Sequence, residues 1–121
     1  MTGLPDNKTP DSYMDIRRMS WSHAEKAIAR KAFERSLQHE LETLVHEAKQ
    51  MAAKIEQPSE LWDLVDFLVK RRDEIDRKYD FRYSILPEVF GVLVREGRVS
   101  EEELRGLAEE KLAYIRKFAK F

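Results

Sequence analysis

Three side chains that could bind a metal ion lie close together in the first half of the chain. His39, Glu42 and His46 are spaced at i, i+3 and i+7, so they share one face of a helix. Helical di-iron proteins need Glu-x-x-His pairs on two helices together with further carboxylates. This chain has no Glu-x-x-His pattern, and its third histidine, His23, lies about four turns away. We interpret the three as solvated helix residues and predict no metal and no other cofactor.

Catalytic chemistry needs a nucleophile next to a base that a third group orients. The serines of this chain stand at predicted helix caps or turns, except Ser36, which lies inside a predicted helix. There is no cysteine, and the four glycines do not form a phosphate-binding loop. We therefore predict that the chain is not an enzyme.

Residues 90–111 have the layout of a DNA-binding helix-turn-helix, with two helices on either side of a short turn. The second helix would begin with Glu101, Glu102 and Glu103, where DNA phosphates would be repelled. The formal net charge of the whole chain is only −1, with both signs interleaved. We predict no nucleic-acid partner.

No apolar segment approaches the ~20 residues that span a bilayer. The N-terminus also lacks the apolar stretch of a secretory signal. The absence of cysteine is compatible with a reducing compartment. We expect a cytoplasmic protein that does not insert into a membrane.

The chemistry that remains is recognition, and it gathers in one segment. Between residues 61 and 69 only two aspartates interrupt the apolar side chains. Trp62, Asp66 and Arg72 lie on or beside this patch, a mixture typical of protein interfaces. A helix that is apolar all round is buried on several sides, and a chain of this size needs a second copy to cover it. The residues expected at the core of that dimer interface are Leu61, Leu64, Val65 and Leu68.

Asp66 and Arg72 have two interpretations. They are six residues apart and so do not share a helix face within one chain. A two-fold pairing would bring Asp66 of one subunit near Arg72 of the other. Otherwise they are two solvated surface charges.

Two long helices must position this segment. Ser22 and Glu25 form a capping-box pattern that opens a helix predicted over residues 22–56, about 50 Å long. Gln-Pro breaks that helix, and Ser59 is the expected N-cap of the next, over residues 60–79. The short connection predicts an antiparallel hairpin.

Two shorter helices are expected to follow. Ser84 would cap the first, with Pro87 in its opening turn and Gly97 as its left-handed C-cap. Ser100 begins a second capping-box pattern and would open the last helix. Its expected apolar face consists of Leu104, Leu107, Ala108, Leu112, Ile115 and Phe118.

The sequence therefore predicts an all-α fold: a long antiparallel helical hairpin, or stalk, with a small two-helix head, assembled as a two-fold homodimer. Residues 1–20 are predicted to be a flexible segment and residues 21–121 a single domain. Within it the stalk is expected over residues 22–80 and the head over residues 84–121.

The segment from residue 61 resembles the fluorescence recovery protein family, whose members carry a very similar Leu-Trp-x-Leu-x-Asp-Phe-Leu run followed by Arg-x-Glu-Ile-Asp-x-Lys-Tyr-Asp. The likeness continues to the C-terminus and, more weakly, upstream to Trp21. The matching residues of the segment are Leu61, Trp62, Leu64, Asp66, Phe67, Leu68, Arg71, Arg72, Glu74, Ile75, Asp76, Lys78, Tyr79, Asp80 and Arg82.

This resemblance implies the same fold and a non-enzymatic regulator. It would bind the C-terminal domain of the photoactivated orange carotenoid protein, speed its return from the red to the orange form, and end quenching of the phycobilisome. The residues assigned to partner binding on this basis are Trp62, Asp66, Arg72, Glu88 and Tyr114.

Three positions depart from the family pattern. Val65 stands where a histidine or other polar residue is usual, Glu88 where an aromatic residue is usual, and Tyr114 where a lysine is thought to contact the carotenoid protein. These exchanges alter the shape and charge of a docking surface. They leave open an alternative, a homologous dimeric helical module whose partner is unrelated to carotenoid photoprotection.

Overall fold

The computed structural model describes residues 19–121, and within them the chain forms helices and no β-strand. The predicted all-α fold is confirmed. Residues 1–18 of the segment predicted to be flexible lie outside the described residues. The elements are α2 (His23–Ala53), α3 (Glu60–Lys78), α4 (Leu86–Arg95), the 3-10 helix η1 (Glu101–Leu104) and α5 (Glu109–Ala119).

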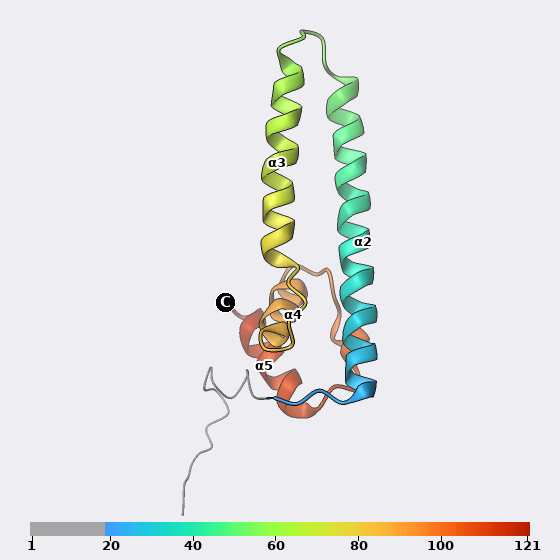
Figure 1. Cartoon of the computed structure of the whole chain (residues 1–121), viewed down its shortest axis with the longest axis vertical. Coiled ribbons are helices and arrows are strands. Elements are labelled where there is room, and N and C mark those ends of the chain that lie inside the picture. Colours follow the sequence, from blue (N-terminus) through green and yellow to red (C-terminus); the bar gives the residue numbers. More distant parts are fainter. Residues whose placement is uncertain (1–18) are drawn as a thin grey trace, which may run out of the picture.

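Helices α2 and α3 lie antiparallel and project beyond the rest of the molecule (Figure 1). The predicted capping box opens α2, since Ser22 Oγ accepts the Glu25 N–H at 3.1 Å and the Glu25 carboxylate accepts the Ser22 N–H at 3.0 Å. The predicted cap by Ser59 is wrong, because its backbone is already helical and its side chain makes no capping bond. The Glu60 carboxylate accepts the backbone N–H groups of Glu56 and Gln57 instead, at 2.8 and 2.6 Å.

Helix α4 begins one residue later than the sequence indicates. Ile85, and not Ser84, is its N-cap residue, while Pro87 lies in the first turn as expected. Gly97 ends the helix at φ +74°, which confirms the predicted left-handed C-cap. The N–H groups of Gly97 and Arg98 donate to the carbonyls of Val94 and Leu93 at 3.0 and 2.8 Å, a Schellman motif.

The last helix is divided, so the prediction of one helix from residue 100 is wrong. The Ser100 capping box is present, but it opens only η1, and α5 starts again at Glu109. Gly106 between them has φ +108°, and a Cβ there would lie 2.5 Å from Ile28 Cδ1 of α2. Leu104 before the break and Leu107 after it are both buried in the core.

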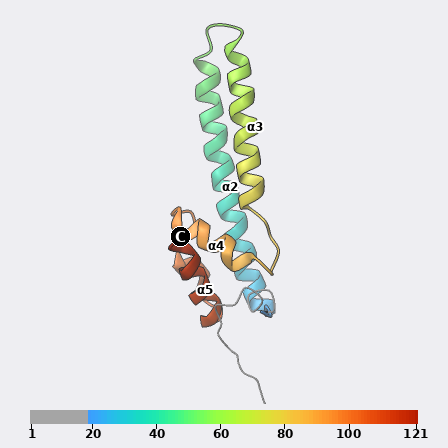
Figure 2. The ribbon, with the colours of Figure 1, turned by 90° about the vertical axis from the view of Figure 1, so that its left-hand side faces the viewer.

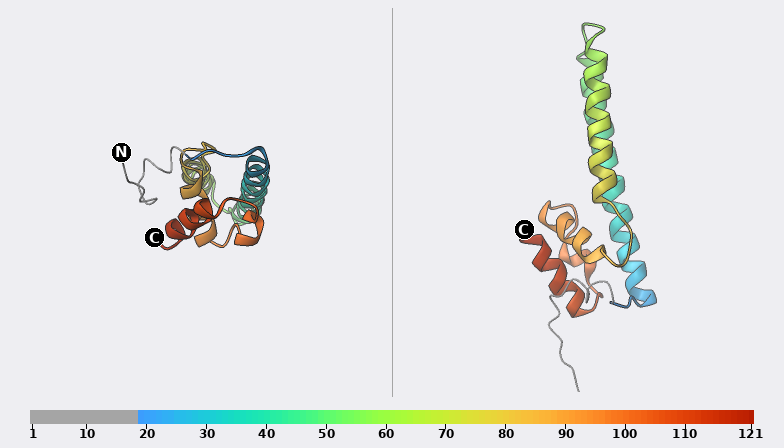
Figure 3. Two further views of the ribbon diagram at one scale, coloured as in Figure 1. Left: turned by 90° about the horizontal axis from the view of Figure 1, so that it is seen from below. Right: turned by 60° about the vertical axis from the view of Figure 1, so that its left-hand side comes forward.

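The hydrophobic core lies at the base of the molecule, where α4, η1 and α5 pack beside the first half of α2 (Figures 2 and 3). Helices α4 and α5 come so close at Gly91 that a Cβ there would lie 2.3 Å from Phe118 Cβ. The buried core residues are Trp21, Ala29, Ala32, Phe33, Leu86, Val89, Phe90, Leu93, Val99, Leu104, Leu107 and Ile115.

The projecting part of the hairpin has no comparable core. No residue from 41 to 74 is fully buried, and Ile75 is the single buried residue of α3. The structure thus joins a packed base to a hairpin whose side chains remain largely accessible.

Candidate functional site

Six large apolar side chains are exposed on the hairpin, and we call this set the stalk face. Trp62 is the most open of them, with 64% of its surface exposed. Outside the stalk face, Phe121 is the only exposed large apolar side chain among the described residues. The stalk face consists of Leu41 and Val45 of α2 and of Leu61, Trp62, Val65 and Val69 of α3.

Helical spacing places five of these side chains on one side of the hairpin, whereas Trp62, nine residues before Arg71, points away from α2. On α3, Leu61, Val65 and Val69 recur at intervals of four, each turned about 40° further round the helix. Arg71 belongs to the row of α3 residues that contacts α2, because its Nη1 lies 2.7 Å from Glu47 Oε1. Leu61 lies beside this row, and Val65 and Val69 lie progressively further from it.

On α2, Leu41 and Val45 are turned from the contact row in the same rotational sense as their counterparts on α3. Because the two helices run antiparallel, equal rotations away from the contact row bring both sets to the same side. Both helices therefore contribute exposed apolar side chains to one side of the hairpin.

The structure brings the four predicted interface residues together on the outer half of α3. Leu61 and Val65 are exposed, whereas Leu64 and Leu68 are half-buried. Leu64 lines a hollow of about 210 Å³ with Met51 of α2. Their role in a dimer remains a prediction, because a single chain does not contain the partner surface.

The five predicted partner-binding residues are not in one patch. Trp62, Asp66 and Arg72 are all exposed on α3, and Arg72 Nε lies 3.5 Å from Asp73 Oδ1. Glu88 is exposed at the base, on a groove of about 430 Å³ between α3 and α4. Tyr114 is only 4% exposed and belongs to the packed base, so its burial gives no support to a direct contact with a partner.

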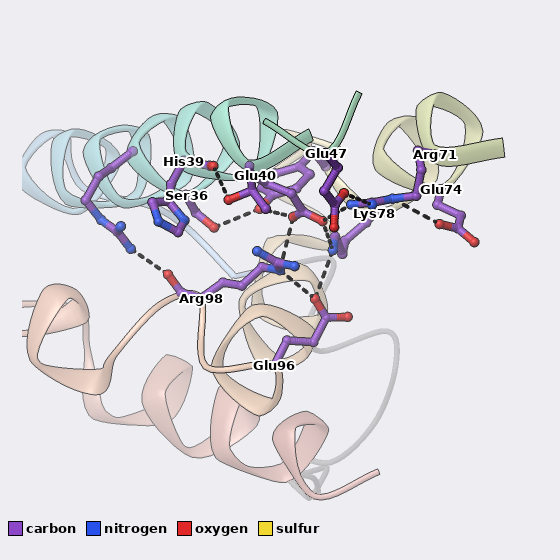
Figure 4. Close-up of polar contacts among 12 residues, drawn as sticks. Ser36, His39, Glu40, Glu47, Arg71, Glu74, Lys78, Glu96 and Arg98 are labelled. Carbon is purple, nitrogen blue, oxygen red and sulfur yellow. Dashed lines mark hydrogen bonds and ion pairs between the residues drawn. The ribbon is translucent and has the colours of Figure 1, made fainter. Parts of the chain in front are cut away.

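The sequence interpretation missed a buried charged cluster at the junction of stalk and base (Figure 4). Glu40 is 3% exposed, and its carboxylate accepts hydrogen bonds from Lys78 Nζ and Tyr79 OH, each at 2.8 Å. Arg98 Nε lies 3.2 Å from the same carboxylate. Ser36 Oγ in turn lies 2.8 Å from Tyr79 OH.

These contacts decide the protonation of the cluster. Burial raises the pKa of Glu40, but the hydrogen bonds from Lys78 and Tyr79 and the charges of Lys78 and Arg98 hold it below the usual value. The pKa of Tyr79 is raised, first by burial and then by the adjacent Glu40 carboxylate. The cluster therefore holds a carboxylate anion and a neutral phenol at neutral pH.

One feature of the sequence could have indicated this buried cluster. Glu40 stands three residues after Leu37 and four before Leu44, on the stripe that faces the partner helix. A carboxylate on an apolar stripe needs charged partners. The sequence does not say which cations from later segments would supply them.

A second buried carboxylate fastens α5 to the start of α2. Glu25 accepts the Ala108 N–H at 2.7 Å and lies 3.2 Å from Lys111 Nζ. Burial raises its pKa, but the N–H groups of Ser22 and Ala108 and the Lys111 ammonium together keep it below the usual value.

Over residues 19–121, His, Cys, Asp and Glu side chains form no group of three or more that could hold a metal ion. In the same part of the chain, no helix has the length and apolarity that crossing a membrane requires.

A packed helical base carrying a projecting hairpin with exposed apolar side chains defines a class: small all-α proteins with a projecting helical hairpin. Comparison with known proteins narrows this class. Residues 21–119 match the family described as photoprotection regulator fluorescence recovery protein. The chain belongs to the fluorescence recovery protein family.

Individual relatives agree with this assignment. A fluorescence recovery protein of Synechocystis is 42% identical over 100 residues, which cover 83% of this chain and 92% of that protein. The solved structure of the Synechocystis protein has a TM-score of 0.80 at 41% identity, and that of the Fremyella diplosiphon protein a TM-score of 0.80 at 35% identity. Both structures cover 84% of this chain and are themselves covered completely.

Proposed function

We propose that this chain is a non-enzymatic regulator that binds the C-terminal domain of the photoactivated orange carotenoid protein. It accelerates the return of the red form to the orange form and so ends quenching of the phycobilisome. The observation that carries this proposal is the 42% identity that extends over 92% of a fluorescence recovery protein. The cytoplasmic location expected from the sequence remains a prediction.

The active form that we propose is a two-fold dimer paired through the stalk face. Two observations support it: no residue from 41 to 74 is fully buried, and five of the six exposed large apolar side chains of that span lie on one side of the hairpin. Two hairpins packed face to face would form a four-helix bundle, a stable arrangement for such helices. Leu61, Leu64, Val65 and Leu68 would form the centre of the interface, with Asp66 of one subunit near Arg72 of the other.

The proposed activity is a shift of the partner's conformational equilibrium. A protein changes such an equilibrium only by binding the two conformations with different affinity. Tighter binding to the orange-like arrangement than to the red one favours the return. Exposed Trp62 and Arg72 offer an aromatic surface and a planar guanidinium for that contact.

The test follows the loss of red absorbance in the dark after illumination of the carotenoid protein, with and without this chain. We expect severalfold faster recovery with the wild type. Arg72→Lys keeps the charge but loses the bidentate guanidinium, so recovery should slow while the melting temperature stays within a few degrees. An Arg72→Lys protein that melts earlier but accelerates recovery fully would show that Arg72 serves folding and not the partner.

The alternative function is a dimeric helical module with a partner unrelated to carotenoid photoprotection. The observation that favours it is the character of the base, where acidic Glu88 is among the exposed residues that line the groove and Tyr114 is buried. A dimeric wild type that leaves the recovery rate unchanged would select this alternative.

A further inference from the structure

We propose that Glu40 is the buried positioning residue that holds the two stalk helices in register and thereby assembles the stalk face from its two halves. The pairing of that face with a second copy rests on the proposed function. The role of Glu40 in ordering α3 against α2 does not.

Glu40 contacts three segments that are distant in sequence (Figure 4). Its carboxylate accepts from Lys78, the last residue of α3, and from Tyr79, the first residue of the joint that follows. It also pairs with Arg98, just beyond the end of α4. One side chain of α2 therefore fastens the lower end of α3 and the base at a single point.

The position of Glu40 along α2 gives these contacts their importance. Glu40 is the last buried residue of the helix, and the hydrophobic core lies entirely on its N-terminal side. Beyond it the apolar contacts of the hairpin are half-buried except at Ile75, and such contacts are non-directional and tolerate sliding of one helix along the other. Polar contacts must then supply the register.

Two ion pairs across the hairpin form a ladder with matched spacing. Glu40 pairs with Lys78 and Glu47 with Arg71, so the partners are seven residues apart on each helix. A slip of one helical turn, about 5.4 Å, would break both pairs. A slip of seven residues would leave at most one pair.

The two ion pairs differ in burial. The buried pair of Glu40 is expected to determine the register, and the exposed pair of Glu47 serves as the control. The side chain of Glu47 is 41% exposed and that of Glu40 only 4%. An exposed pair contributes little because water and salt screen it. A buried carboxylate that loses its cations is strongly unfavourable, so alternative registers are excluded chiefly by Glu40.

The neighbourhood contains other charges that do not replace this contact. Arg71 Nη2 lies 3.8 Å from Glu40 but is already paired with Glu47. Glu96 shares Lys78 at 2.9 Å and Arg98 at 3.1 Å, from the surface of the base. Glu96 belongs to the base alone and cannot connect α2 to α3.

Hydrogen–deuterium exchange of the full chain, read by mass spectrometry for each peptide, tests the proposal. Glu40→Gln keeps the shape but removes the charge, and loss of a charged hydrogen bond should speed exchange of residues 60–78 about ten- to hundredfold. Residues 86–119 should retain wild-type protection. Glu47→Gln, the matched control, should change both regions less than about threefold. Arg98→Gln, which removes a partner on the base side, should give a weaker change of the Glu40→Gln type.

The pattern along the chain separates positioning from general stability. Equal acceleration of residues 60–78 and 86–119, or complete unfolding of Glu40→Gln, would make Glu40 an ordinary stabilising residue and overturn the proposal. An effect of Glu47→Gln as large as that of Glu40→Gln would overturn it too.

Sedimentation of the same variants measures the consequence for pairing. If the wild type dimerises, Glu40→Gln should weaken the dimer at least tenfold although Glu40 lies outside the stalk face. Wild-type affinity in that variant would refute the assembly of the face by Glu40. A monomeric wild type would instead remove the proposed dimer, and the exchange pattern would still decide whether Glu40 orders α3.

Discussion

Placing a charge in the stalk face is the most direct perturbation of the proposed dimer, and Leu61→Glu does so at the predicted centre. Leu61 is 47% exposed in the single chain. Full burial of a leucine side chain is worth ~1.5–3 kcal/mol, so covering this exposed half contributes about 1 kcal/mol. A two-fold interface contains the residue twice, which gives about 2 kcal/mol.

The carboxylate adds a second penalty, since an unpaired charge would be taken out of water at both copies. Even a few kcal/mol for this desolvation brings the total above about 4 kcal/mol. That weakens the dimer about a thousandfold, from micromolar to millimolar. We expect Leu61→Glu to be monomeric and still helical at concentrations where the wild type is dimeric.

Light scattering after size exclusion measures the mass, and circular dichroism checks the helices. Gln50→Glu is the matched control, because Gln50 is exposed and stands nine residues after Leu41, half a turn round α2. It should dimerise like the wild type. A monomeric wild type, or a Leu61→Glu protein that pairs with unchanged affinity, would refute the reasoning from the stalk face.

Three further results are expected. Gly91→Ala should lower the free energy of unfolding by about 1–3 kcal/mol in a urea titration, because its Cβ would lie 2.3 Å from Phe118 Cβ; an unchanged midpoint would contradict the close packing of α4 on α5. Glu25 and Glu40 have folded pKa values below the ordinary 4.5, so the stability they provide is complete above that pH and lost as the pH falls through their folded values. Thermal melts at descending pH should show this loss, and Glu40→Gln should flatten it. Binding of the carotenoid protein should decrease acrylamide quenching of exposed Trp62, whereas Trp62→Phe, which retains only buried Trp21, should show no such decrease.

The sequence predicted helix caps correctly where a short pattern of residues is enough to determine the local structure. The boxes at Ser22 and Ser100 and the left-handed cap at Gly97 are present as predicted, because each depends on bonds within a few residues. Ser59 and Ser84 have the residue type of a cap but not its role. At Ser59 the chain is already helical, and the neighbouring glutamate binds the free N–H groups.

Contacts between distant segments were beyond the reach of the sequence. The division of the last helix depends on the approach of Gly106 to Ile28, a contact with α2 that no local pattern records. The same holds for Glu40, whose partners come from α3, the joint and the loop after α4. Apolar spacing did indicate an open face on α3, but the contribution of Leu41 and Val45 from α2 required the geometry of the hairpin.

The unbroken course of α2 through base and stalk makes it a lever. From Glu40 to its end at Ala53 the helix extends about 20 Å, and from Glu40 back to His23 about 25 Å. A tilt of about 5° at Glu40 would therefore move the tip of the helix by nearly 2 Å, about half the distance at which apolar side chains touch. A small tilt of α2 at the base therefore moves the far end of the hairpin far enough to make or break a contact between side chains.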